Sequence, residues 1–273
     1  MTTLWVDGRL CDPDEPSLSA LDHGFTVGDG VFETLKVVRG VPFALTRHLD
    51  RLERSATGLG LRAPDRDRVR AACEAVLSAC PHDEVWRLRI TYSAGRGPLG
   101  SDRSDTLPTL VVAASPATAW ASGAAVAIAP WPRNERGSLV GLKTTSYADN
   151  VVALAWAHER GASEAIMLNT RGRLCEGTGS NVFVVVDGQA LTPALSSGCL
   201  AGITRQLVLE WTDAREADLD ADALRKASEA FLTSSTRDVQ PIAMVDRAEI
   251  PIGPVTQDVQ RVFTECCEAD PDP

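Results

Sequence analysis

The stretch GDGVFETLKVVRGVPFALTRHLDRLERSA, residues 28–56, decides the fold of the first half of the chain. Its first part, VFETLKVV (31–38), alternates and is rich in β-branched residues, which predicts a strand. Arg39–Gly40 then predicts a turn into VPFAL. In the last part leucine and alanine recur at helical spacing (Leu49, Leu52, Ala56, Leu59), which predicts a helix with one apolar face.

Strand and helix patterns are mixed along the rest of the chain. TLWVDGRL predicts a hairpin that turns at Asp7–Gly8, and a second helix is expected over roughly residues 65–80. Strands are predicted at 85–94 and 108–115, then in AAVAIAP, EAIML, NVFVVV, the segment after Asp187–Gly188, AFLT and IAMV; helices are predicted through VVALAWAHER, ITRQLVLEWT, ADALRKASEA and PVTQDVQRVFTEC. Because the order is not strictly βαβ, the pattern indicates an α+β protein.

The stretch ATAWASG (117–123) is the best candidate for a domain boundary, because it is rich in small residues and follows a predicted strand. A length of 273 residues fits one large or two modest domains. We therefore expect an N-terminal domain over 1–116, a linker over 117–123 and a C-terminal domain over 124–273.

Composition excludes several classes of function. A net charge of −10 and a pI near 4.9 argue against nucleic acid as the main partner, since binding phosphates needs clustered Lys and Arg. No apolar run approaches the ~18–20 residues needed to cross a bilayer, and the acidic start does not resemble a secretory signal. These features predict a cytoplasmic protein without a membrane partner. Seven cysteines without CxxC spacing argue against a disulfide framework and against a metal site.

Amine chemistry has few candidates here, because only three of the 27 basic residues are lysines: Lys36, Lys143 and Lys226. Lys143, in VGLKTTSYADN, is either a solvent-exposed lysine or an amine that attacks a carbonyl. Glu176, in RLCEGTGSNVF, follows it by 33 residues. It is either a surface carboxylate at the start of a strand or a partner for a pyridine nitrogen.

Two segments could bind phosphate. GITR (202–205) begins a predicted helix with a glycine, which leaves backbone N–H groups available to an anion, although a plain helix cap is the simpler explanation of this segment alone. SSTRD (234–238) offers three hydroxyl groups or is only a polar turn. Arg51, considered alone, is an exposed arginine on a helix.

In their order, these segments resemble the class IV aminotransferases, the enzymes of fold type IV that depend on pyridoxal 5′-phosphate (PLP). Residues 28–56 resemble the N-terminal signature of that family, and a lysine followed after 32 residues by EGTGSNVF resembles its lysine-plus-glutamate signature. GITR and FLTSSTRDVQPI resemble its phosphate-binding segments. The resemblance covers roughly residues 5–263 and implies a smaller α/β N-terminal domain and a larger C-terminal domain with a barrel-like sheet.

The resemblance also implies roles for individual residues. Lys143 resembles the Schiff-base lysine and general acid/base, and Glu176 the partner of the pyridine nitrogen. Tyr147 is similar to the tyrosine that meets the ring hydroxyl in branched-chain members, although it follows the lysine by four residues rather than five. The phosphate site would consist of Arg51, Ile203, Thr204 and Ser235. The implied partners are PLP, a small amino donor, a keto acid and a second copy of the chain in a homodimer.

Several activities of this family compete. FETLK, from Phe32 to Lys36, is most similar to D-amino-acid aminotransferases, so that both residues are candidate substrate contacts. The Arg-x-His typical of those enzymes is absent from SAGRGPLGSD (93–102), and its GRG is closer to aminodeoxychorismate lyases. The pattern favours a transaminase acting on D-amino acids or R-amines, with the lyase that forms 4-aminobenzoate and pyruvate as the alternative. Branched-chain L-amino-acid transamination is a lesser alternative, and PLP binding without turnover is disfavoured.

Two arginines are candidates to bind the substrate carboxylate, since a guanidinium can hold a carboxylate through two hydrogen bonds. In WRLRITY, strand alternation places Arg87, Arg89 and Thr91 on one face and the apolar Leu88 and Ile90 on the other. Arg89 therefore faces solvent or a polar cleft. Arg96 lies in the glycine-rich loop that follows, where three glycines let the backbone turn the guanidinium toward a cleft, so Arg96 is the favoured candidate. Surface charge is the alternative explanation for both arginines.

Overall fold

The computed structural model describes residues 2–15, 17–81 and 84–273, which form two compact units. The first unit comprises Met1–Thr118, Leu142–Tyr147 and Pro271–Pro273, and the second comprises Ala119–Gly141 and Ala148–Asp270. The first change of unit lies inside the stretch 117–123. The division differs from the expected boundaries at two places, because residues 142–147 and 271–273 belong to the first unit.

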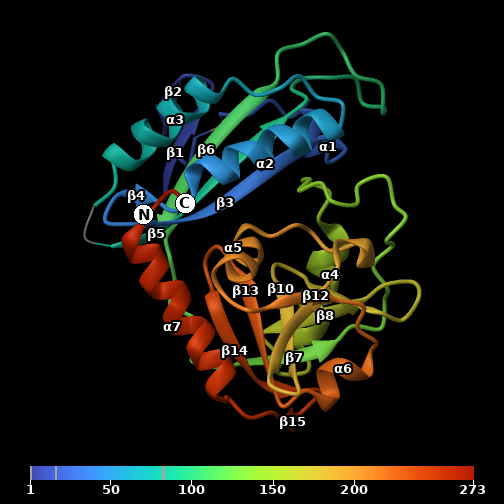
Figure 1. The fold of residues 1–273 in the computed structure, drawn as a ribbon. Coiled ribbons are helices and arrows are strands. Elements are labelled where there is room, and N and C mark those ends of the chain that lie inside the picture. The colour runs from blue at the N-terminus through green and yellow to red at the C-terminus, as the bar shows by residue number, and fades with distance from the viewer. Residues whose placement is uncertain (1, 16, 82–83) are drawn as a thin grey trace. The chain divides into compact units, whose positions relative to one another are not determined.

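The first unit contains a six-stranded antiparallel sheet in the order β2-β1-β6-β5-β3-β4 (Figure 1). Its strands are β1 (Thr3–Val6), β2 (Arg9–Cys11), β3 (Gly30–Val38), β4 (Val41–Pro42), β5 (Val85–Ser93) and β6 (Thr109–Pro116), with a short helix α1 (His23–Thr26) before β3. The predicted turns at Asp7–Gly8 and Arg39–Gly40 both join hairpins, and positive φ angles at all four residues suit such tight turns.

Two helices, α2 (Leu45–Gly58) and α3 (Arg66–Ser78), pack on one face of this sheet (Figure 1). The core includes Leu88 and Ile90 of β5 and Leu52 of α2, all fully buried. The alternation expected for β5 is confirmed, because Arg87 and Arg89 lie outside this core. The opposite face of β3 and β5 is therefore available to polar side chains.

The second unit contains a nine-stranded sheet in the order β12-β11-β10-β13-β14-β7-β8-β9, with β15 paired to β14. The strands are β7 (Ala124–Ile128), β8 (Glu164–Leu168), β9 (Leu174–Gly177), β10 (Asn181–Val186), β11 (Gln189–Pro193), β12 (Arg215–Ala217), β13 (Glu229–Ser234), β14 (Asp238–Val245) and β15 (Ala248–Glu249). Strand β9, at one end of the order, also contacts β10 and β11. The sheet therefore curls on itself, which confirms the expected barrel-like α+β architecture.

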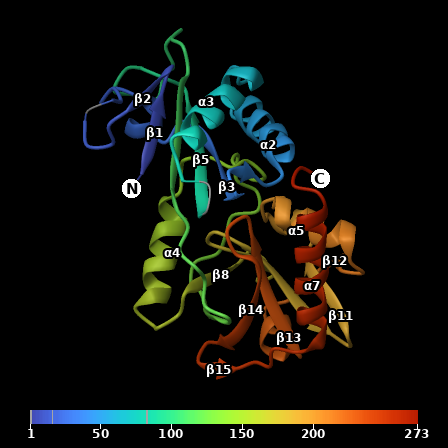
Figure 2. The same cartoon turned by 90° about the vertical axis from the view of Figure 1, so that its left-hand side faces the viewer.

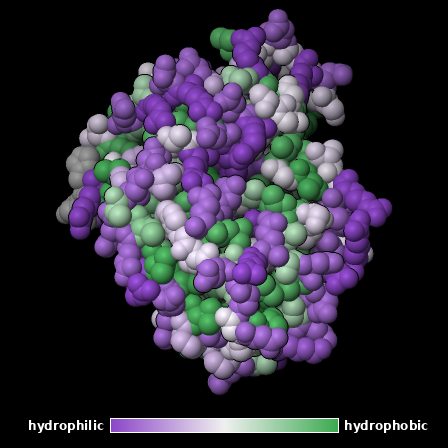
Figure 3. Space-filling view, viewed as in Figure 1, coloured by the Kyte–Doolittle hydropathy of each residue, from purple (hydrophilic) through white to green (hydrophobic). Residues whose placement is uncertain are grey.

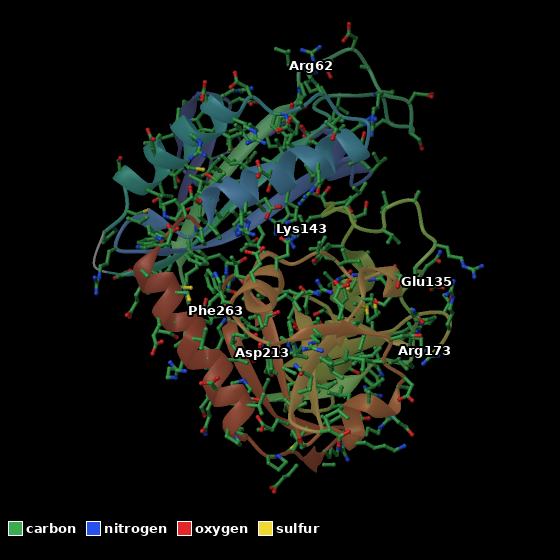
Figure 4. All side chains as sticks on the ribbon, in the orientation of Figure 1. Arg62, Glu135, Lys143, Arg173, Asp213 and Phe263 are labelled. Carbon is green, nitrogen blue, oxygen red and sulfur yellow. The ribbon has the colours of Figure 1, made fainter. Side chains whose placement is uncertain are left out.

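Helices cover this sheet on two sides. Helix α4 (Ala148–His158) packs against β7 and β8, whereas α5 (Ile203–Trp211) and α7 (Pro254–Ala269) pack against β13. Figure 2 shows α4 and α7 on opposite sides of the strands. Phe263, labelled in Figure 4, is buried, and its ring lies 5.4 Å from that of Trp211. A 3₁₀ turn (Leu195–Ser197) and α6 (Asp222–Lys226) complete the unit.

One predicted helix, ADALRKASEA, is wrong over its second half. Helix α6 ends at Lys226, since Ala227 already has an extended backbone. Glu229 and Ala230 instead begin β13 and pair with β10. The Glu229 carboxylate accepts hydrogen bonds from the backbone N–H groups of Val255 and Thr256 at the start of α7. Tertiary pairing thus overrides a local helix preference.

Among the described residues, no helix is both long and apolar enough to span a membrane. The face drawn in Figure 3 is largely hydrophilic, with hydrophobic residues in smaller groups between polar ones. This mixture of surface polarity is ordinary for a folded protein.

Candidate active site

Lys143 belongs to a segment that pairs with the start of β3. The Phe32 amide donates to the Lys143 carbonyl at 2.9 Å, and the Thr145 amide donates to the Gly30 carbonyl at 2.8 Å. On the other side, the Lys143 amide donates to Ser55 Oγ of α2 at 3.1 Å. The lysine, labelled in Figure 4, therefore stands on a backbone that is fixed from both sides.

The GDG sequence makes this close approach possible. A Cβ on Gly30 would lie 3.0 Å from the Tyr92 carbonyl oxygen and 3.1 Å from Thr145 Oγ1. Gly28 has a φ of +70°, and a Cβ there would lie 2.8 Å from Ser146 Oγ. Only glycine combines this backbone angle with so little space.

The Lys143 side chain reaches a group of aromatic and cationic side chains, which we call the lysine cluster: Phe32, Arg89, Lys143 and Tyr147. Lys143 Nζ lies 4.4 Å from the Phe32 ring centroid and 5.7 Å from that of Tyr147. The two rings meet edge to face at 5.1 Å, and Arg89 Cζ lies 3.7 Å from the Phe32 centroid. The structure thus brings four sequence-predicted site residues together.

Strand pairing explains why Arg89 reaches this cluster. Phe32 pairs with Thr91 and Thr34 with Arg89, so that all four project from the same face of the sheet. Desolvation lowers the pKa of the Arg89 guanidinium, and the nearby Tyr147 and Glu33 oppose this shift. Arg89 nevertheless remains a cation at any physiological pH.

The described contacts do not bring the other two candidate substrate residues into the lysine cluster. Lys36, further along β3, has its Nζ 5.9 Å from the Phe43 ring centroid. Arg96 is exposed on the loop after β5, where its backbone forms a bridge with Asp22 and its carbonyl accepts from Thr106 Oγ1. The sequence favoured Arg96 over Arg89, whereas among the described contacts it is Arg89 that lies beside Phe32.

Arg51, predicted to bind phosphate, forms a buried ion pair on the other face of β3. Its Nε and Nη2 donate to the Glu33 carboxylate at 2.8 and 2.6 Å, and His48 Nδ1 lies 2.6 Å from the same carboxylate. Burial alone would raise the pKa of Glu33, but Arg51 and His48 together lower it to about 2. Desolvation lowers the pKa of His48, and the charges of Arg51 and Lys143 add to this decrease against the opposing effect of Glu33.

We expect Glu33→Gln to destabilise the protein by about 3–5 kcal/mol at pH 7, because it leaves the buried Arg51 charge without its partner. The folded-state pKa of Glu33 lies below its ordinary value of 4.5, so the carboxylate's contribution is complete above about pH 4.5 and is lost as the pH falls toward 2. Urea unfolding at several pH values should therefore show the difference between variant and wild type shrinking over that interval.

The matched control is Glu53→Gln, which affects an exposed ion pair between α2 and Arg66. Surface ion pairs of this kind contribute little to the free energy of unfolding, so the effect of Glu53→Gln should be much smaller at every pH. If Glu33→Gln lowers the free energy of unfolding no more than Glu53→Gln does, the buried pair does not stabilise the fold as expected.

Glu176, in the second unit, is buried at the end of β9 and bound from two directions. Its Oε1 accepts from Arg133 Nη2 at 2.7 Å and Nε at 3.1 Å, and its Oε2 accepts from the Leu200 amide at 2.9 Å. Asn150 Oδ1 accepts from Arg133 Nη1 at 3.3 Å. The carboxylate is consequently held in one orientation with a cation beside it.

The two predicted phosphate segments meet at Asn181, the first residue of β10. Asn181 Nδ2 donates to the Leu200 carbonyl at 2.9 Å, and Gly202 lies so close to Asn181 Oδ1 that a Cβ there would clash. On its other side Asn181 pairs with Thr233 of β13, just before Ser234 and Ser235.

Helix α5 begins at Ile203, and its N-cap residue, Gly202, has no side chain that could accept a hydrogen bond from the first N–H groups of the helix. The first N–H groups of a helix have no partner inside the helix and attract anions. Thr233 Oγ1 is a buried hydroxyl for which the described part of the chain supplies no hydrogen-bond partner. The oxygens of a phosphate group can accept hydrogen bonds from both kinds of donor.

Sequence reasoning missed Arg133, Asn181, Glu33 and His48 as members of these groups. Asn181 lies within the quoted EGTGSNVF signature, which was the available signal. Arg133 gives no comparable signal, because it is one of many arginines and contacts Glu176 from 43 residues away. Its role follows from tertiary contact alone.

Comparisons with known proteins agree with this geometry. The family model described as amino-transferase class IV matches residues 30–245. A bifunctional aminodeoxychorismate lyase / D-amino acid transaminase from Mycobacterium tuberculosis is 32% identical, over 97% of this chain and 96% of the relative.

Two solved structures are also similar. A branched-chain aminotransferase from Thermoproteus uzoniensis with norvaline superposes with a TM-score of 0.90 at 29% identity, covering 96% of this chain and 93% of that one. A hypothetical aminotransferase from M. tuberculosis in its PLP-bound form has a TM-score of 0.87 at 27% identity, covering 98% and 99% of the two chains. From the matched residues and the fixed lysine together it follows that this chain belongs to the class IV aminotransferases, PLP-dependent enzymes of fold type IV.

Proposed function

We propose that this protein transfers an amino group from an amino acid, with D-amino acids favoured, or from an R-amine to a 2-keto acid, and that Lys143 holds its PLP. The observation that carries this proposal is the lysine cluster. It places an amine on a fixed backbone beside two aromatic rings and the Arg89 cation. An amine that must attack and release carbonyl carbons needs such a defined position.

The residues present fit PLP by the chemistry of their donors. The N–H groups of Ile203 and Thr204, the Ser235 hydroxyl and the Thr233 hydroxyl, which is buried without a partner among the described residues, suit a phosphate. We assign Arg51 as the cation of that phosphate site, with its orientation fixed by Glu33. Glu176 suits a protonated pyridine nitrogen, and we assign Tyr147 to the ring hydroxyl.

When bound, PLP supplies an aldehyde for covalent attachment and a ring that accepts the electron pair left when a substrate proton departs. Lys143 Nζ would hold the aldehyde carbon and afterwards carry the α-proton of the substrate. Glu176, with the Arg133 guanidinium hydrogen-bonded to it, would hold the proton at the ring nitrogen. Phe32 and Tyr147 would limit the positions that the lysine side chain can take.

Arg89 is our candidate for the residue that binds the substrate carboxylate. Its stacking on Phe32, whose ring is also approached by Lys143, supports Arg89 over Arg96 and Lys36. Arg89→Ala should raise the apparent KM for amino acids and 2-keto acids about 10- to 100-fold, the scale of one charge-assisted pair of hydrogen bonds. The half-reaction with R-1-phenylethylamine, which has no carboxylate, should change little.

Arg96→Ala serves as the matched control, and single-turnover kinetics with both substrate types would be measured for each variant. If Arg89→Ala slows the half-reactions of the amine and of the amino acids equally, Arg89 acts by packing on Phe32. A loss confined to Arg96→Ala would transfer the carboxylate role to Arg96.

The lyase is the second candidate, because the relative from M. tuberculosis carries both activities in its name. A single screen separates the two. The cofactor's absorbance would be followed after stoichiometric mixing with D-alanine, L-leucine, R-1-phenylethylamine and aminodeoxychorismate. A transaminase leaves pyridoxamine phosphate after each of the first three that it accepts, whereas a lyase returns PLP and releases pyruvate from the last. Assembly as a homodimer remains a prediction, to be checked by light scattering.

A further inference from the structure

A second buried carboxylate in the second unit, Glu164, is not used by the roles assigned above. It is the first residue of β8 and is 1% exposed. Its Oε1 accepts from the Thr178 amide at 3.0 Å, the Ala165 amide at 3.1 Å and, in a short contact, Thr178 Oγ1. Its Oε2 accepts from Ser180 Oγ at 3.0 Å and from Arg237 Nη2 at 3.3 Å.

Arg237, its ionic partner, is equally well fixed. The guanidinium lies 3.7 Å from the Trp120 ring centroid, and its Nη1 donates to Gln240 Oε1 at 2.5 Å. Gln240 Nε2 in turn donates to the Ala121 carbonyl at 2.8 Å. Both side chains of the Glu164–Arg237 pair are almost completely buried, at 2% and 5% exposure.

The pair joins two turns that are distant in sequence. One is the turn 177–180, which follows Glu176 directly and whose Thr178 and Ser180 both bind Glu164. The other is the turn between β13 and β14, which contains Ser235 as well as Arg237, and whose Arg237 amide donates to the Ser234 carbonyl. Glu164 therefore provides a side-chain link between the segment of Glu176 and the segment of Ser235, in addition to the backbone pairing of Asn181 with Thr233.

Burying two charges is costly unless each is fully hydrogen-bonded, and a well-packed apolar pair often provides equal stability. The described bonds engage both oxygens of Glu164 and both Nη atoms of Arg237, but stability alone does not explain why an ion pair stands here. A geometric role accounts for it, because charged hydrogen bonds of fixed direction hold two turns at a defined separation.

We propose that the Glu164–Arg237 ion pair is a positioning device, which sets the separation between Glu176 and the Ser235 turn so that both bind one PLP molecule at once. The proposal rests on the proposed function, in which Glu176 faces the ring nitrogen and Ser235 the phosphate. A ligand held at two points gains affinity only when the two contacts are spaced to match it. Disturbing the spacing should therefore lower the affinity for PLP more than the affinity for pyridoxal or for inorganic phosphate, each of which carries only one of the two contact groups.

The test compares three ligands on the full-length apoenzyme: PLP, pyridoxal, which lacks the phosphate, and inorganic phosphate. The variants are Glu164→Gln and the double variant Glu164→Gln/Arg237→Gln, which removes both charges and leaves neither unpaired. We expect the affinity for PLP to fall about 10- to 100-fold. This is part of the affinity that a ligand gains when its two contacts are made at the same time. The affinities for pyridoxal and for phosphate should each stay close to those of the wild type.

Glu229→Gln is the matched control, since Glu229 is another buried carboxylate of the same unit but bonds only to the start of α7 among the contacts described. Its PLP affinity should not change. Circular dichroism and the unfolding midpoint of each apoenzyme show whether a loss of PLP affinity reflects unfolding, and Glu229→Gln shows whether neutralising a buried carboxylate of this unit lowers PLP affinity by itself.

Two results would overturn the proposal. PLP affinity in both Glu164 variants equal to that of Glu229→Gln would show that the pair is only structural. A parallel loss of inorganic phosphate binding would show that Arg237 contacts the phosphate directly. Failure of the proposed function has a different signature, because the wild-type protein would then bind PLP without modification at Lys143.

Discussion

Lys143→Ala is expected to abolish covalent attachment of the cofactor and to lower turnover by at least about 10⁴-fold, since it removes both the attachment point and the proton carrier. The physical reason is the position of the amine. Lys143 Nζ sits over the Phe32 ring on a backbone fixed to β3 and α2, and no other lysine shares that environment among the described residues. The measurement is borohydride reduction of the holoenzyme followed by peptide mass spectrometry.

The other two lysines are natural controls. Lys36 lies over Phe43, and Lys226 pairs with Asp222 on the exposed surface of α6. Lys36→Ala and Lys226→Ala should retain the visible absorbance of the bound cofactor. Recovery of the pyridoxyl adduct on either of them would refute the assignment of Lys143.

Glu176→Gln should leave PLP bound but slow removal of the substrate α-proton by about 10²- to 10³-fold, the usual scale for losing one electrostatic contact in an active site. Glutamine keeps the acceptor for the Leu200 amide, so the local fold should persist. It cannot, however, balance Arg133 and a protonated ring nitrogen as a carboxylate does. Stopped-flow half-reactions with and without an α-deuterated donor would measure the step directly.

Glu229→Gln again provides the comparison, because it neutralises a buried carboxylate that carries no assigned role toward the cofactor. An unchanged half-reaction in Glu176→Gln would show that another residue faces the ring nitrogen. A loss of cofactor binding with little change in the rate of proton removal would make Glu176 a binding residue rather than an electrostatic one.

Much of the local structure could be predicted from the sequence, because hydrophobic periodicity and turn residues act over short distances. The alternation in β3 and β5, the glycine turns and the spacing of leucines in α2 all have this local origin. The failure at Glu229 and Ala230 has the opposite origin, since strand pairing with β10 there outweighs the helix-favouring residues.

The sequence by itself therefore determined the elements, the short list of lysines and the order of motifs that identifies the family. Only the tertiary structure decided which charges meet. Arg133 reaches Glu176 across 43 positions, and Arg237 reaches Glu164 across 73. It also returned residues 142–147 to the first unit, where Lys143 meets Phe32 and Arg89. Hydrophobic periodicity indicates whether a side chain is buried. Which residue that side chain contacts depends on how distant strands are brought together in the folded sheet.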